Sequence, residues 1–109
     1  MKAAEKLKTR FMIRADLPRI CQIEAESFGP VDAWSEDDFL DVIRERANIA
    51  HVAVFDDRIA GYLIQERCGD AYRILSIAVD PEYRRLGAGR RLVERMIVKL
   101  KASGGPDRI

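Results

Sequence analysis

The feature that most constrains this chain is an apolar run at residues 74–79, followed at residues 84–91 by a segment with four arginines and two glycines. A strand that turns through glycines into a helix leaves free backbone N–H groups at the start of that helix. The arginines add positive charge where the helix dipole is already positive, and the first acidic residue after them is Glu94. Because this arrangement costs stability unless something negative binds, the segment predicts an anion site.

Two common nucleotide motifs do not fit the segment. The dinucleotide-binding pattern G-x-G-x-x-G would need a third glycine where the chain has Leu92, and the P-loop pattern G-x-x-x-x-G-K-[ST] is absent. The pattern R-x-x-G-x-G does fit, at Arg84, Gly87 and Gly89. With the strand before it, this stretch resembles the signature of the GNAT superfamily of acyl-CoA-dependent N-acyltransferases, in which the motif holds the pyrophosphate of coenzyme A.

The resemblance implies an N-acetyltransferase that moves an acetyl group from acetyl-CoA to a primary amine, either a protein N-terminus or a small molecule. Backbone N–H groups at residues 85–90 would cradle the pyrophosphate, and arginine side chains would add charge-assisted bonds. The strand at residues 77–79 would pair through its main chain with the pantetheine arm. No metal is implied. The implied cofactor-binding residues are Ile77, Ala78, Val79, Arg84, Arg85, Leu86, Gly87, Ala88, Gly89 and Arg90.

A second segment narrows the resemblance, which covers about residues 10–102. Residues 33–39 are similar to the P-W-S-x-x-x-F segment of the ribosomal-protein N-terminal alanine acetyltransferases, and Ile23 and Glu24 also fit that group. The segment departs from the pattern at Ala33, where proline is usual. The implied acceptor is then a protein N-terminus.

The first part of the chain has the signals of one strand and two helices. A short strand is expected at residues 11–14. Asp16 is placed to cap a helix with a proline in its first turn, which runs to about residue 28 and is broken by the Gly29-Pro30 pair. Ser35 and Asp38 have the spacing of a capping box and predict the start of a second helix.

The second part predicts three strands and a helix. Residues 51–55 and 59–64 read as an antiparallel hairpin, and a third strand is expected at residues 72–79. The predicted fold class is α+β with α/β/α-type layers, the N-terminal part of the GNAT fold: a mixed, mostly antiparallel sheet flanked by helices, in the order β-α-α-β-β-β-α. The apolar face of the last helix is expected to carry Leu92, Val93, Met96, Ile97 and Leu100.

The length and the net charge of the chain limit which other functions are compatible with the sequence. A chain of 109 residues has room for one domain, with residues 1–9 and 103–109 expected to be flexible. A net charge of +1 does not favour a general nucleic-acid surface, although the arginine cluster leaves RNA or DNA binding as a weaker alternative. No apolar run is long enough for a membrane span and the start lacks the features of a signal peptide, so a cytoplasmic protein is expected. Cys21 and Cys68 are interpreted as small buried side chains.

The catalytic residues are unknown from the sequence. In the matching family the general base, a glutamate, and the general acid, a tyrosine, come from strands after this helix, beyond residue 109. The chain is therefore expected to be truncated, or completed by a partner or by a homodimer. An inactive CoA-binding or interaction module is the alternative. Other titratable residues are interpreted as solvated or capping charges and as packing residues: Glu24, Glu26, His51 and Glu66 are in the first group, Tyr72 and Tyr83 in the second.

Overall fold

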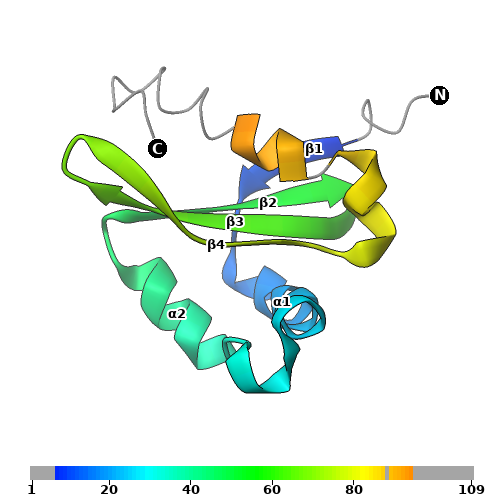
Figure 1. Ribbon diagram of the computed structural model, residues 1–109, viewed down its shortest axis with the longest axis horizontal. Coiled ribbons are helices and arrows are strands. Elements are labelled where there is room, and N and C mark those ends of the chain that lie inside the picture. The colour runs from blue at the N-terminus through cyan, green and yellow to red at the C-terminus, as the bar shows by residue number, and fades with distance from the viewer. Residues whose placement is uncertain (1–6, 88, 95–109) are drawn as a thin grey trace.

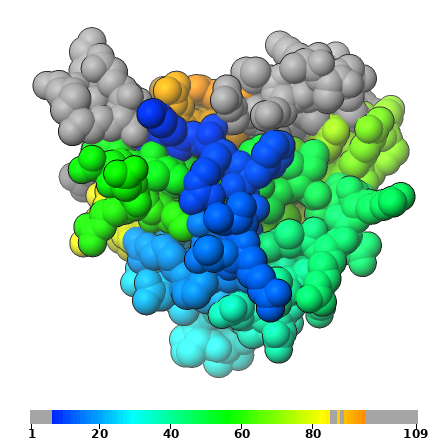
Figure 2. Space-filling view, turned by 180° about the vertical axis from the view of Figure 1, so that it is seen from behind, coloured from blue at the N-terminus to red at the C-terminus, as the bar shows by residue number. Residues whose placement is uncertain are grey.

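The computed structural model describes residues 7–87 and 89–94 and contains one four-stranded antiparallel sheet (Figure 1). The strands lie in the order β1-β2-β3-β4, so β1 and β4 form the two edges of this sheet. Figure 2 shows β1, coloured blue, at the surface on the side away from β4. The strands are β1 Leu7–Phe11, β2 Asn48–Phe55, β3 Arg58–Cys68 and β4 Ala71–Val79.

Helices lie on both faces of the sheet (Figure 1). The helices α1 Leu17–Asp32 and α2 Glu36–Arg44 connect β1 to β2 and cover one face. Two 3-10 helices, η2 Arg14–Asp16 and η3 Pro81–Leu86, precede α1 and follow β4. The helical residues 89–94 lie over the other face. The predicted fold class and the predicted element order are confirmed.

Two apolar clusters, one on each face of the sheet, form the core. Because side chains alternate along a strand, Tyr62 and Ile64 pack under α1 and α2, while Leu63 packs on the opposite face with Leu92 from residues 89–94. The packing predicted for the last helix is confirmed at Leu92 and Val93. Its other expected apolar residues, at positions 96, 97 and 100, lie outside the described residues.

The helix boundaries follow local signals with one exception. Ser35 caps α2 with the predicted capping box: its hydroxyl accepts from the Asp38 amide, and the Asp38 carboxylate accepts from the Ser35 amide. Gly29 has φ of +80° and interrupts α1 near the predicted break. Asp16 stands at the predicted N-cap position of α1, but its side chain does not cap the helix, because its carboxylate accepts from the Arg10 guanidinium and from the Ile13 amide instead.

Several strand boundaries differ from the prediction. The first strand spans Leu7–Phe11 rather than residues 11–14, and residues 7–9, expected to be flexible, are part of it. The hairpin strands are longer than expected, and the turn between them places Asp56 and Asp57 at positive φ, a pattern typical of a type I′ turn. Residues 1–6 and 103–109, the rest of the expected flexible ends, lie outside the described residues.

Candidate functional site

The backbone of β4 presents hydrogen-bonding groups to its open edge at two of the three predicted strand positions. The Asp80 amide donates to the Ala60 carbonyl at 2.8 Å, and the register pairs Val79 with Gly61 and Ile77 with Leu63. In an antiparallel ladder, bonded and non-bonded pairs alternate. The N–H and C=O groups of Ile77 and Val79 therefore point away from β3, whereas those of Ala78 are used inside the sheet.

The chain leaves β4 through a turn formed by Asp80, η3 and Gly87, here called the corner. Asp80 is the N-cap of η3: its carboxylate accepts from the Glu82 amide at 2.9 Å and pairs with the Arg19 guanidinium of α1, and its carbonyl accepts from the Tyr83 amide at 2.8 Å. Burial alone would raise the pKa of the Asp80 carboxyl, but the Glu82 amide and the Arg19 guanidinium outweigh it, so this pKa lies below its ordinary value. The corner fixes where the chain leaves the strand.

The corner contains a 3-10 helix that was not expected. The prediction that the chain turns directly from the strand through two glycines into the helix is wrong, because η3 lies between the end of β4 and the first of these glycines. An Asp N-cap followed at once by Pro81 is a helix-start signal that could have revealed it.

The structure requires glycine for its backbone conformation at only one of the two motif positions, Gly87, and not at Gly89. Gly87 ends η3 in the left-handed conformation, with φ of +82°, which side chains rarely adopt. Its carbonyl accepts from the Arg91 amide at 3.0 Å and so begins the next helical turn. A Cβ at Gly89 would lie 3.5 Å from Val79 Cγ2, an ordinary contact, so packing within the described chain does not require glycine there.

The arginines of the segment surround this corner. Arg84, Arg90 and Arg91 are exposed. Arg84 folds back so that its Nε–H donates to the Val79 carbonyl at 3.1 Å. Arg85 and Leu86 contribute backbone to η3, and Ala88 lies outside the described residues.

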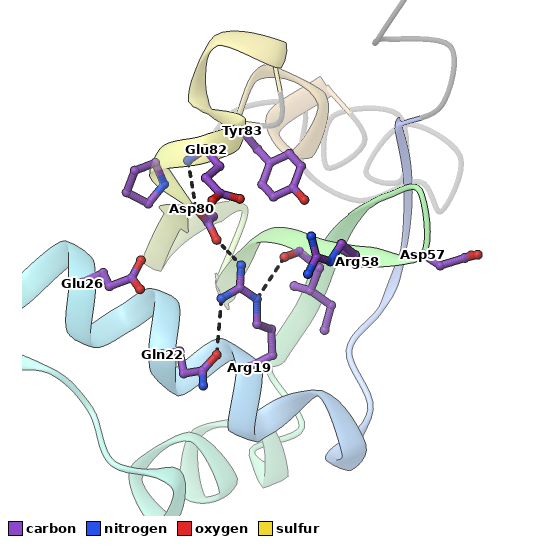
Figure 3. Close-up of a pocket in the computed structure, with 10 residues that line it drawn as sticks. Arg19, Gln22, Glu26, Asp57, Arg58, Asp80, Glu82 and Tyr83 are labelled. Carbon is purple, nitrogen blue, oxygen red and sulfur yellow. Dashed lines mark hydrogen bonds and ion pairs between the residues drawn. The ribbon is translucent and has the colours of Figure 1, made fainter.

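A pocket of about 670 Å³ opens on the α1 side of the corner (Figure 3). Arg19 lies at its centre and donates to the Ile59 carbonyl at 3.4 Å and to the Gln22 side chain at 3.3 Å, besides pairing with Asp80. Glu26 projects from α1 toward the same space. Among the described residues, none of those expected to bind the cofactor lines this pocket. Arg19 is already engaged, and four carboxylates in the lining outnumber the one further cation, Arg58, so the pocket does not favour an anion.

A buried polar network lies between α1 and the sheet. Glu24 is 2% exposed, and its carboxylate accepts from the Trp34 amide at 3.0 Å, from the Tyr62 hydroxyl and from Ser76 Oγ at 3.5 Å. The expectation of a solvated charge at Glu24 is wrong. Its spacing from Leu17 and Ile20, two buried residues seven and four positions before it on the same helix face, was the missed signal.

The other titratable candidates divide as follows. His51 is 1% exposed and stacks on Phe11, so the expected surface or capping role is wrong. Tyr72 and Tyr83 are buried and pack in the core, as predicted. Glu66 pairs with Arg73 across the β3–β4 edge and stays partly solvated. Glu26 is exposed, as predicted, Cys21 is half-buried, and Cys68 is exposed, contrary to the expectation for it.

Comparison with known proteins adds three findings. The acetyltransferase (GNAT) family matches residues 17–109. A [ribosomal protein bS18]-alanine N-acetyltransferase from Salmonella typhimurium is 39% identical over 90 residues, which cover 82% of this chain and 58% of the relative. The crystal structure of the ribosomal-protein-S18-alanine N-acetyltransferase from Escherichia coli superposes with a TM-score of 0.79 at 27% identity, covering 91% of this chain and 62% of that one.

A more distant structure agrees in fold. Ard1 from Thermoplasma volcanium gives a TM-score of 0.79 at 21% identity, covering 89% of this chain and 65% of that one. The chain thus spans less than two thirds of the length of these relatives. Within residues 7–87 and 89–94 the structure contains neither a helix long and apolar enough to cross a membrane nor a group of three His, Cys, Asp or Glu side chains placed to hold a metal.

Proposed function

The chain belongs to the acetyltransferase (GNAT) family, and we propose that it binds acetyl-CoA and takes part in acetyl transfer to a primary amine. The observation that carries the proposal is the junction of two features: the open backbone edge of β4 at Ile77 and Val79, and the arginine-rich corner that follows it. Few other ligands combine an amide-containing arm with a diphosphate, and the two features lie side by side in the chain.

The strand edge suits the arm. The carbonyl of Ile77 and the amide of Val79 point to the same side of β4, and together they match one acceptor and one donor of an extended amide chain. A ligand bound there gains main-chain hydrogen bonds at the edge of the described sheet, where no strand competes for them. Ala78 contributes its position in the strand rather than free backbone groups.

The corner suits the diphosphate. Exposed guanidinium groups at Arg84 and Arg90 can form charge-assisted bonds to phosphate oxygens. Gly87 precedes the helical residues 89–94, and the backbone N–H groups at a helix start, together with the helix dipole, favour negative charge. The proposed cofactor site therefore comprises residues 77–79 and 84–90.

Acetyl transfer needs more than the cofactor. The attacking amine must be neutral, which requires a general base, and the departing thiolate requires an acid. An amide N–H at the end of β4 would polarise the thioester carbonyl and stabilise the oxyanion that forms as the amine attacks. The proposal assigns no base or acid to the residues of this chain, and an inactive CoA-binding module is the alternative reading.

We propose a protein N-terminus as the acceptor. Relatives at 34–39% identity are named [ribosomal protein bS18]-alanine N-acetyltransferases, and a ribosomal protein as substrate supports a location in the cytoplasm. Three residues of the segment that resembles this group are structural in the fold: Ser35 caps α2, and Trp34 and Phe39 form a row of edge-on aromatic contacts that ends at Tyr62 of β3. They shape the segment between α1 and α2 rather than supplying the chemistry.

Calorimetric titration with CoA tests the cofactor site. The wild-type chain should bind CoA, and the double variant Arg84→Ala, Gly87→Asp should not, because it removes a guanidinium and places a carboxylate beside the phosphates. The matched control is Arg67→Ala, Gly69→Asp, which makes the same changes at an exposed arginine and a positive-φ glycine in the β3–β4 turn. Equal CoA affinity in all three proteins would refute the site.

Turnover separates the enzyme from the alternative. Acetyl-CoA is incubated with a peptide that begins with alanine, and mass spectrometry follows acetylation of its amine, with an N-terminally blocked peptide as control. CoA binding without acetylation supports the inactive module. We also propose that a second copy or another chain completes the sheet without covering the outward backbone groups of Ile77 and Val79; sedimentation that shows only monomers of this chain during turnover would refute this part.

A further inference from the structure

Arg84 occupies the Val79 carbonyl, a third outward backbone group of β4 that an extended arm can use besides the Ile77 carbonyl and the Val79 amide. The carbonyl of Val79 points to the open edge of β4, and the Nε–H of Arg84 donates to it at 3.1 Å. Arg84 is exposed, so this bond can exchange without disturbing the core. The residue proposed to hold the diphosphate is thus bound to the strand proposed to hold the arm.

The hydrogen bonds of the corner keep the Arg84 guanidinium close to the Val79 carbonyl. Asp80, between them in the chain, is bonded to the Ala60 carbonyl, the Glu82 amide and the Arg19 guanidinium. Because Arg19 and Glu82 already satisfy the Asp80 carboxylate, it adds long-range attraction for Arg84 without an ion pair to it. Arg84 therefore has two competing positions, on the Val79 carbonyl or on an anion beyond the corner.

We propose that Arg84 is a latch that couples the two halves of the cofactor site. A diphosphate bound at the corner draws the guanidinium away, because hydrogen bonds between two charged groups are stronger than those to a neutral carbonyl. The Val79 carbonyl is then free to accept from an amide of the acyl arm. This inference rests on the proposed function and adds to it that the two ends of the ligand bind cooperatively.

Ligand fragments measure the coupling directly. Pantetheine carries the arm without the diphosphate, and inorganic pyrophosphate carries the diphosphate without the arm. Titrations of the full isotope-labelled chain, followed by NMR at the amides of Ile77 and Val79, give the pantetheine affinity with and without pyrophosphate. The gain or loss of one net hydrogen bond at an exposed site corresponds to an affinity change of about three- to tenfold.

In the wild type, pyrophosphate should strengthen pantetheine binding by about three- to tenfold, because it releases the latch. In Arg84→Met, pantetheine should bind tighter than in the wild type by a similar factor, and pyrophosphate should have no further effect. CoA should bind this variant more weakly, because the guanidinium is missing. The matched control, Arg90→Met, removes an exposed arginine of the same segment and should weaken CoA but leave pantetheine unchanged.

The outcomes distinguish the latch from the site. A wild type that binds CoA, with equal pantetheine affinity in the wild type and in Arg84→Met, overturns the latch alone. Pantetheine binding that ignores pyrophosphate in the wild type does the same. A chain that binds neither CoA nor pantetheine overturns the proposed function and the latch with it.

Discussion

Replacing Glu24 with alanine should destabilise the fold strongly. A charge on the helix surface, which the sequence predicts at this position, would contribute much less. The change removes the acceptor of the Trp34 amide and of the Tyr62 hydroxyl. A buried donor left without an acceptor costs about 1–3 kcal/mol, and a lost bond to a charged acceptor costs about 1.5–3 kcal/mol. The Tyr62 hydroxyl keeps Ser76 as a partner at 3.1 Å, which limits the loss. We expect the free energy of unfolding to fall by about 3 kcal/mol.

The assay is urea denaturation followed by the fluorescence of Trp34, the single tryptophan of the chain. Glu26→Ala, an exposed glutamate one half-turn further along the same helix, is the control and should change stability by less than about 0.5 kcal/mol. Combining Glu24→Ala with Tyr62→Phe should cost less than the sum of the two single changes, by about 1 kcal/mol or more. Wild-type stability in Glu24→Ala, or strictly additive effects in the double variant, would refute the network.

Three further changes test other parts of the fold. Gly61→Ala would place a Cβ 2.8 Å from the Ala78 carbonyl, so the β3–β4 pairing must shift; urea denaturation should show a loss of about 1–3 kcal/mol and CoA titration a weaker affinity, and unchanged values would contradict this. Asp80→Asn tests the lowered pKa: the folded-state value lies below the unfolded one of about 3.9, so the carboxylate stabilises the fold above that pH and loses this contribution as the pH falls through the folded pKa. The difference in unfolding free energy between wild type and Asp80→Asn should be constant from about pH 5 to 8 and shrink below about pH 4; a constant difference down to about pH 2 would sink the argument. Ser35→Ala removes the acceptor of the Asp38 amide at the start of α2 and should cost about 1 kcal/mol in thermal unfolding, with Ser27→Ala on α1 as the control.

The sequence predicted the elements whose signals are local. The capping box of α2 needs residues three positions apart, and the structure has it as expected. Asp16 has the same kind of signal and stands at the N-cap of α1, but Arg10, in the neighbouring strand, binds its carboxylate, which makes no bond to the helix start. A local cap is thus predictable only while no residue from another element competes for the side chain.

The buried network was not predictable in the same way. The donors to Glu24 lie 10, 38 and 52 positions further along the chain, and pairing of distant strands decides whether they meet. The helical period alone indicates that position 24 faces the core, and it does not say which groups satisfy the carboxylate there. For the candidate site, the motif predicts which residues bind the ligand, and this stays a prediction; the strand register adds which backbone groups of Ile77 and Val79 are open.

Helix α1 holds β4 from one face at two places, and this determines how the edge strand can respond to a ligand. Arg19 pairs with Asp80 at the end of the strand. The Glu24 carboxylate accepts a hydrogen bond from Ser76 Oγ, one residue before the proposed binding stretch. Between these anchors lie Ile77 and Val79, whose outward groups have no such restraint from α1. A ligand at the edge therefore binds a strand that is fixed at both sides of its contact, so little backbone ordering is left to oppose binding. Removing either interaction, Arg19 with Asp80 or Glu24 with Ser76, should lower the affinity for the ligand even though neither pair is proposed to touch it.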